Sequence, residues 1–136
     1  EAREAGRFLS AMALSHQRET RSIAFVAGGE TIVRVTGTGL GGRNQELALA
    51  AAPRPDGLRD TAIFSFGSDG TDGPTDAAGG YVDHRTMGKL RAAGLDVENA
   101  LLNNDSYHAL RACDGLLKTG PTGTNVNDVA VVMIRR

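Results

Sequence analysis

Three aspartates lie in a glycine-rich run at residues 67–80, which reads GSDGTDGPTDAAGG. Asp69, Asp72 and Asp76 carry like charges at close spacing, so a cation or a ligand must offset their repulsion if they act together. Mg²⁺ usually binds one or two protein carboxylates, and a single aspartate can instead accept a proton from a hydroxyl group. We expect Asp69 to bind metal or act as a catalytic base, with Asp72 as a second metal ligand. Turn formation and helix capping are the alternative for Asp72 and Asp76.

The run GTGLGG at residues 37–42 matches the pattern G-x-G-x-x-G between an expected strand and an expected helix, which is typical of dinucleotide binding. Two features oppose this interpretation. Arg34 interrupts the preceding strand, which in a dinucleotide-binding unit is apolar and buried. The acidic residue expected about 20 positions later falls in a loop, at Asp56 or Asp60.

An anion site at the start of the same helix is the alternative. The first backbone N–H groups of a helix attract anions, and an arginine in the first turn opposes the helix dipole unless it faces a negative group. We therefore expect Gly41, Gly42 and Asn44 to bind substrate or phosphate beside Arg43. A solvated arginine next to Glu46 is the competing interpretation.

A second polar loop, TGPTGTNVND at residues 119–128, separates two expected strands. Its glycines and proline fix a tight path. Its hydroxyl and amide side chains suit the recognition of phosphate, ribose or hydroxyl groups, although turn formation explains them nearly as well; these residues are Thr122, Thr124, Asn125 and Asn127. Glu30, in the run GGE, is a further candidate, although a carboxylate at a hairpin tip is ordinarily exposed to solvent.

Helical and strand patterns alternate along the chain, so we expect an α/β fold with a mixed β-sheet flanked by helices. The runs SIAFVA and TIVRVTG, joined by Gly28-Gly29-Glu30, predict one antiparallel hairpin. Further strands are expected at residues 61–67, 115–120 and 129–134, and helices at residues 43–52, 84–94 and 106–113.

The first 17 residues, EAREAGRFLSAMALSHQ, have the apolar spacing of an amphipathic helix. No capping residue precedes this helix. We therefore expect residues 1–17 to be a helix that leads in from an N-terminal domain outside this sequence, and residues 18–136 to form one α/β domain.

The composition is that of an ordinary globular domain, with 40% hydrophobic and 23% charged residues among 136. A net charge of −1 gives no electrostatic attraction to nucleic acid or an anionic membrane. No apolar run approaches the ~20 residues that span a bilayer. Cys113 is the single cysteine, which excludes an internal disulfide and favours a reducing, cytoplasmic location.

Five runs, in this order and spacing, resemble the C-terminal MOFRL domain of class II glycerate kinases, which are glycerate 2-kinases often labelled hydroxypyruvate reductases. The runs are GGET, GGRNQE, GSDGTDGPTDAAG, NNDSY and GPTGTNVND. The resemblance extends from about Ser22 to Ile134. It implies that this chain is the second of two α/β domains, that the active site lies in the cleft between them, and that the first domain supplies a catalytic lysine.

The resemblance also implies a reaction, the transfer of the γ-phosphoryl group of ATP to the 2-hydroxyl of D-glycerate with Mg²⁺, which gives 2-phosphoglycerate. The catalytic residues carried over by motif are Glu30, Arg43, Asp69 and Asn125. The implied cofactors are ATP and Mg²⁺. The implied partners are D-glycerate and the N-terminal kinase domain of the same parent chain, and without that domain we expect the fragment to be inactive.

Two other functions stay open from the sequence. The run GTGLGG favours an NAD(P)-dependent hydroxypyruvate reductase. A non-catalytic module that binds an acidic metabolite would use the same arginine and polar loops.

Overall fold

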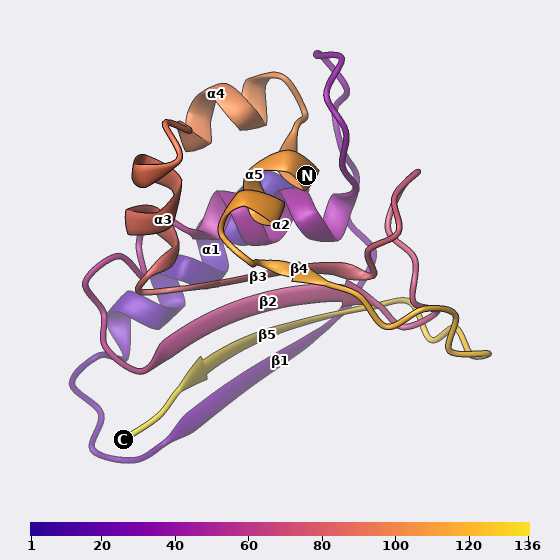
Figure 1. The fold of residues 1–136 in the computed structure, drawn as a ribbon. Helices are drawn as coiled ribbons and strands as arrows, with labels where there is room; N and C mark the ends of the chain where they lie inside the picture. The colour runs from indigo at the N-terminus through magenta and orange to yellow at the C-terminus, as the bar shows by residue number, and fades with distance from the viewer.

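The computed structural model describes residues 1–136 and consists of one five-stranded sheet with helices on one face (Figure 1). The strand order is β1-β5-β2-β3-β4. The strands are β1 Ile23–Gly29, β2 Thr61–Gly67, β3 Gly79–Asp83, β4 Leu116–Leu117 and β5 Asp128–Ile134, and the helices are α1 Ala2–Ser15, α2 Arg43–Ala51, α3 Thr86–Ala92, α4 Val97–Leu102 and α5 Ser106–Ala112. None of these helices is long and apolar enough to cross a membrane.

The expected α/β class, with helices flanking a sheet, is confirmed. The strand directions differ in detail, because all four neighbouring pairs are antiparallel. β2 and β3 are antiparallel because the connection between them is a loop that contains no helix. The chain therefore turns back directly beside β2.

The hairpin expected across Gly28-Gly29-Glu30 is wrong. β1 pairs along its whole length with β5, and residues 31–36 form no strand. The backbone of this segment finds other partners, since the Asn104 side chain accepts the N–H of Thr36 at 2.7 Å and donates to the carbonyl of Arg34 at 3.1 Å. β5 is the better partner for β1 because the core-facing residues of β5 are buried. Pairing with β5 therefore extends the sheet that covers the core.

The sequence patterns miss two elements, β3 and α4. β3 begins with two glycines, which the local pattern assigns to a loop. A side chain at Gly80 would come within 2.6 Å of Leu110 Cδ1 and 2.9 Å of Ala48 Cβ, so glycine lets this strand pass directly beneath α2 and α5. α4 has only six residues and is capped by Asp96, whose side chain accepts the N–H of Asn99.

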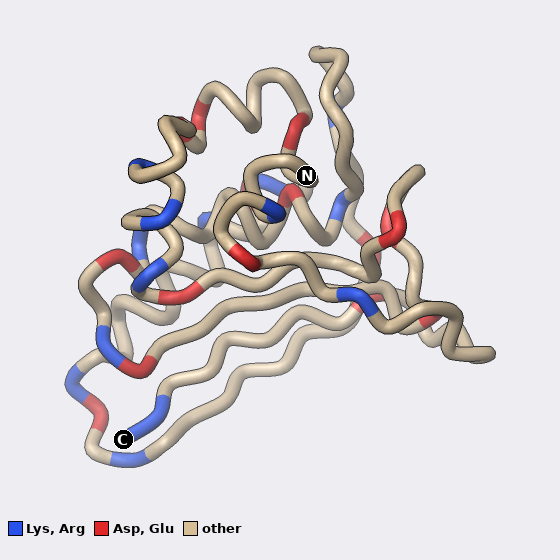
Figure 2. Tube along the Cα trace, in the orientation of Figure 1, with Lys and Arg blue, Asp and Glu red and all other residues tan.

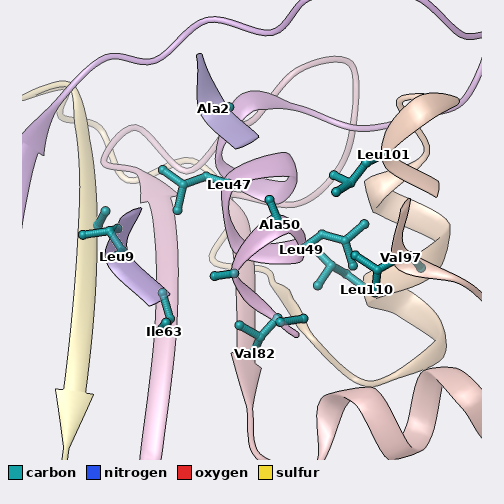
Figure 3. Close-up of a cluster of buried hydrophobic side chains, with 14 of the residues drawn as sticks. Ala2, Leu9, Leu47, Leu49, Ala50, Ile63, Val82, Val97, Leu101 and Leu110 are labelled. Carbon is teal, nitrogen blue, oxygen red and sulfur yellow. The ribbon is translucent and has the colours of Figure 1, made fainter. Parts of the chain in front are cut away.

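Helix α2 is the centre of the core, because every residue after Arg43 in this helix is buried. Figure 3 shows Leu47 on the side of α1 and the sheet, near Leu9 and Ile63, whereas Leu49 lies on the side of α4 and α5, near Leu110. A helix that is buried on all sides needs neighbours in every direction. The fold supplies them as the sheet below, α1 on one flank and the α3–α5 segment on the other.

The close packing of α1 against α2 depends on Gly6. A Cβ atom at this position would overlap the backbone carbonyl of Leu47 and lie 3.3 Å from Ala50 Cβ. The two helices therefore approach each other more closely than any residue with a side chain would permit at this point.

We expect Gly6→Ala to lower the free energy of unfolding by about 1–3 kcal/mol, because the cost of overpacking exceeds the gain in helix propensity of about 1 kcal/mol. Gly88→Ala is the matched control, since Gly88 also lies inside a helix but has no atom within 4 Å of the added Cβ. This control should raise the free energy of unfolding by about 0.5–1 kcal/mol. Urea unfolding followed by circular dichroism measures both changes, and stabilisation by Gly6→Ala would contradict the close helix contact.

Candidate active site

The predicted catalytic residues come together at one end of the strands, where β1 and β2 end and β5 begins. We call this end of the sheet the site edge, or simply the edge. Gly29, Asp128 and Gly67 are neighbours in the strand register at this edge. Glu30 follows β1 directly, and Asp69 lies two residues beyond β2. Figure 1 shows that the loop after β2 and the loop before β5 both lie at this end of the sheet. Figure 2 shows several acidic residues in the chain at this end of the sheet, opposite the C-terminus.

Arg43, the first residue of α2, binds two carboxylates. Its Nε and Nη2 atoms donate to the two oxygens of Asp128 at 2.5 and 3.1 Å, and its Nη1 lies 3.1 Å from Glu30 Oε1. The Asp128 side chain is 10% exposed and the Glu30 side chain 58%. The competing interpretation, a solvated Arg43 next to Glu46, is not observed, because Arg43 binds Asp128 and Glu30 and the buried Glu46 binds Arg3.

Asp128 is the member of this site that the sequence patterns miss. It ends the polar loop TGPTGTNVND, where an aspartate before an apolar strand is read as a turn residue. Its hydrogen bond raises the pKa of the Arg43 guanidinium above the ordinary value, against the effect of burial. The one signal in the sequence that points to such a residue is Arg43 itself, since an arginine at the start of a helix needs an acidic partner.

Asp69 is partly exposed and keeps one oxygen free. Its Oδ1 accepts the backbone N–H of Thr71 at 2.9 Å and the Thr71 hydroxyl at 3.0 Å, whereas its Oδ2 has no partner in the chain. These hydrogen bonds, with a smaller contribution from the charge of Arg43, lower the pKa of Asp69 below its usual range. Asp69 therefore presents an ionised oxygen to the surroundings at neutral pH.

This single free carboxylate oxygen fits a Mg²⁺ ion that is shared with a ligand. No group of three or more His, Cys, Asp or Glu side chains lies close enough together to hold a metal ion. Mg²⁺ needs no such group, because it commonly binds one or two protein carboxylates and completes its coordination with water and substrate phosphates.

The loop before β5 is fastened to the loop after β2. The backbone N–H of Thr122 donates to the Asp69 carbonyl at 3.1 Å, and that of Val126 donates to Ser68 Oγ at 2.7 Å. The Ser68 N–H in turn donates to the Asn127 carbonyl at 3.1 Å. Asp69 and the polar loop therefore form one unit.

The uncharged side chains of that loop are exposed beside Asp69. They are the four predicted to bind substrate or phosphate or to act in catalysis: Thr122, Thr124, Asn125 and Asn127. Two of them also shape the loop, because the Thr122 hydroxyl donates to the Ser68 carbonyl and Asn125 Oδ1 accepts the Asn127 N–H at 3.0 Å.

Asp72 is buried and caps the start of α2. Its Oδ1 accepts the N–H and the side-chain amide of Asn44 at 3.0 and 3.2 Å, and its Oδ2 accepts the N–H and the side-chain amide of Gln45 at 2.8 and 3.0 Å. Burial raises the pKa of Asp72 despite these hydrogen bonds. Both oxygens are thus occupied by the fold, and this geometry favours helix capping over the predicted metal binding. Asn44 is buried by the same contacts, which leaves it no group to offer phosphate.

Asp76 ties the glycine-rich loop to its neighbours. Its Oδ1 accepts the hydroxyl of Tyr107 at 2.8 Å, and its Oδ2 binds Lys118 Nζ at 2.7 Å. These contacts lower the pKa of Asp76, with the Lys118 hydrogen bond as the largest cause. Asp76 therefore joins this loop to α5 and to the segment after β4.

The glycine-rich run GTGLGG is held by the protein itself. The five backbone N–H groups of residues 36–40 all donate to oxygens of residues 103–105, at 2.7–3.1 Å. A Cβ atom at Gly39 would lie 2.6 Å from both the Asn103 carbonyl and the Asp105 backbone. These glycines thus permit close packing, and their N–H groups cannot also bind the pyrophosphate of a dinucleotide.

Part of the expected anion site remains. The N–H groups of Gly41 and Gly42 have no partner in the chain, and both residues line a cavity of about 350 Å³ together with Arg43. Only at this end of the glycine-rich run do the backbone N–H groups lack a partner within the chain.

Known proteins resemble the chain over nearly its whole length. It is 52% identical to the D-glycerate 2-kinase of Thermotoga maritima and 46% identical to the glycerate 2-kinase of Pyrococcus horikoshii, covering 98% of this chain in both cases and 33% and 31% of those proteins. An Agrobacterium vitis protein provisionally named hydroxypyruvate reductase is 37% identical over 98% of the chain and 36% of its own length. The crystal structure of glycerate kinase from Thermotoga maritima matches with a TM-score of 0.94 at 51% identity, over 98% of this chain and 33% of that one.

The chain spans about a third of the length of the curated relatives it matches. A protein-family model described as the MOFRL family matches residues 23–128, which include the edge of the sheet where Glu30, Arg43, Asp69 and Asp128 meet. The resemblance seen in the five sequence runs is thereby confirmed, and the chain belongs to the MOFRL family.

Proposed function

We propose that this chain is the C-terminal part of an ATP-dependent glycerate 2-kinase, which transfers the γ-phosphoryl group of ATP to the 2-hydroxyl of D-glycerate and forms 2-phosphoglycerate. The observation that carries the proposal is the convergence of Arg43, Glu30 and Asp69 with the polar loop at one edge of the sheet. The relatives named glycerate 2-kinase, at 46–52% identity, support the choice of reaction.

The chemistry of these groups suits phosphoryl transfer, which depends on positioning and on neutralising oxygen charge more than on covalent help from the protein. Arg43 would bind an anionic oxygen of glycerate or of a phosphate, because guanidinium groups match both. Asp69 would hold Mg²⁺ through its free oxygen or accept the proton of the substrate hydroxyl. Mg²⁺, when bound, would neutralise phosphate oxygens. Asn125 and Thr124 would orient ligand oxygens without adding negative charge.

The rest of a longer kinase chain is the proposed partner of this part. Large apolar side chains are exposed close to the candidate site, although such groups normally avoid water. Phe8 is 66% exposed, Val35 74% and Val126 72%. Phe8 and Val35 line the cavities that also contain Glu30 and Arg43. A second domain that closes over the site would cover these side chains and supply the remaining catalytic groups.

The proposed function is tested in a chimera in which these 136 residues replace the matching third of the Thermotoga maritima enzyme. We expect ADP release that requires D-glycerate and Mg-ATP, no oxidation of NADH or NADPH with hydroxypyruvate, and no ADP release from the 136-residue chain alone. A folded chimera that oxidises NADH or NADPH, or that releases no ADP, would contradict the kinase proposal. The exchange is feasible because the two sequences are 52% identical.

Asp69→Ala and Asp72→Ala form a matched pair within one loop. Asp69→Ala should abolish glycerate-dependent ADP release by the chimera while changing the free energy of unfolding by less than about 1 kcal/mol, because the side chain is partly exposed. Asp72→Ala should lower the free energy of unfolding by about 2 kcal/mol, because it leaves buried donors of α2 unpaired. Enzyme assays and urea unfolding measure the two effects. Full activity of the Asp69 variant would refute its assignment.

The pKa of Asp69 predicts how activity responds to pH. Because the folded pKa lies below the ordinary value of about 4, the carboxylate stays ionised throughout the pH range 5–8 and loses its charge only at more acidic pH. We therefore expect no inflection between pH 5 and 8 in the kcat of the chimera that depends on Asp69. Asp69→Glu, measured over the same range, is the comparison. An inflection near pH 6–7 that this substitution shifts would show that the Asp69 pKa is raised instead.

A further inference from the structure

We propose that Asp128 is a positioning residue, which holds the Arg43 guanidinium in the orientation needed to receive an anionic ligand oxygen. The functional part of this inference rests on the proposed kinase reaction, whereas the structural part can be measured in the isolated chain. Asp128 itself would not touch the substrate.

The contact between the two side chains is a paired one. Arg43 donates from Nε and Nη2 to the two oxygens of the same carboxylate, at 2.5 and 3.1 Å. Two parallel hydrogen bonds fix the plane of the guanidinium as well as its distance, which a single contact cannot do. The other carboxylate on this guanidinium, Glu30, reaches only Nη1, at 3.1 Å.

The two carboxylates that contact Arg43 differ in exposure, which makes Asp128 its lasting partner and Glu30 the partner that a ligand can replace. The Asp128 side chain is 10% exposed, whereas that of Glu30 is 58% exposed. Exposed ion pairs contribute little and exchange readily with solvent or solute ions. A ligand anion can therefore replace Glu30 on Nη1 while Asp128 continues to hold the other side of the group.

The fold makes room for this arrangement at the start of β5. Asp128 lies between Gly29 of β1 and Gly67 of β2 in the strand register, so neither neighbouring strand presents a side chain beside it. A Cβ atom at Gly67 would lie 3.6 Å from Asp128 Oδ1. Asp128 belongs to the alternate residues of β5 that face the helices, together with Val132 and Ile134, and this face is where α2 places Arg43.

The remaining donors of Arg43 define what the held group can bind. A guanidinium has five N–H donors, and the two hydrogen bonds to Asp128 use two of them, whereas Glu30 forms an ion pair with Nη1 and no hydrogen bond. The three left over are the two N–H groups of Nη1 and one of Nη2. Arg43 lines the same cavity as Gly41 and Gly42, whose N–H groups have no partner in the chain, so an oxyanion bound in this cavity would have side-chain and backbone donors near it.

The first measurement is the Nε–Hε signal of Arg43 in ¹H–¹⁵N spectra of the 136-residue chain. A paired Nε–H exchanges slowly with water, so we expect a sharp signal that is assigned by its loss in Arg43→Lys. Asp128→Asn should broaden it beyond detection. Glu30→Gln is the matched control, since it removes the same charge from the same guanidinium at Nη1, and the signal should persist.

The second measurement is a double-mutant cycle in the chimera with the Thermotoga maritima enzyme. Asp128→Asn should lower kcat on the order of 100-fold, the loss that a displaced catalytic group can cause. The same substitution in an Arg43→Lys background should lower kcat by less than about threefold, because a positioning residue has no effect once its target is changed. A general structural role would instead give losses that multiply.

The two measurements separate the possible failures. Persistence of the Arg43 signal in Asp128→Asn, or multiplying losses in the cycle, would overturn the positioning role. Activity of Asp128→Asn within threefold of the unmodified chimera would overturn it as well. If the unmodified chimera is folded but inactive, the kinase proposal fails, and the Arg43 signal still decides whether Asp128 holds the guanidinium.

Discussion

The capping of α2 by Asp72 is the interaction on which the geometry of the site depends. One buried carboxylate binds the first turn of the helix through the backbone and side-chain amides of Asn44 and Gln45. Asn44 continues the connection, because its side chain accepts the hydroxyl of Ser65 on β2 at 2.6 Å. Loop, helix and strand are thereby joined at the point where Arg43 begins the helix. The hydrogen bonds offset a desolvation cost that is visible in the raised pKa of Asp72.

This constraint explains how one glycine-rich loop accommodates three aspartates. Asp72 is buried against the helix, Asp76 is paired with Lys118, and Asp69 faces outward with one free oxygen. Burial raises the pKa of Asp72, whereas hydrogen bonds and charge lower those of Asp69 and Asp76. The repulsion inferred from the sequence is relieved because each carboxylate has donors of its own. Only Asp69 is left with an oxygen to offer a cation.

The sequence predicts what is local and misses what depends on distant partners. The segments at residues 43–52 and 61–67 form a helix and a strand as expected, because their patterns are long and uninterrupted. The hairpin after β1 fails because the true partner, β5, lies about a hundred residues later. The same limit applies to the site. Asp69 and Asp72 look alike in sequence, and only packing buries one of them; Asp128 is found only when the strand register places it beside Arg43.

The glycine-rich segments also show which backbone donors the fold leaves free. A phosphate-binding loop keeps its backbone N–H groups free for the ligand. Here the N–H groups of residues 36–40 donate to oxygens of residues 103–105. Those of Asn44 and Gln45 donate to the side chain of Asp72. At the start of α2, the N–H groups of Gly41 and Gly42 and the remaining N–H groups of Arg43 stay free. The side chains of Arg43 and Glu30 are 38% and 58% exposed, so a ligand bound to them would stay open to solvent unless the second domain of the proposed kinase covered it.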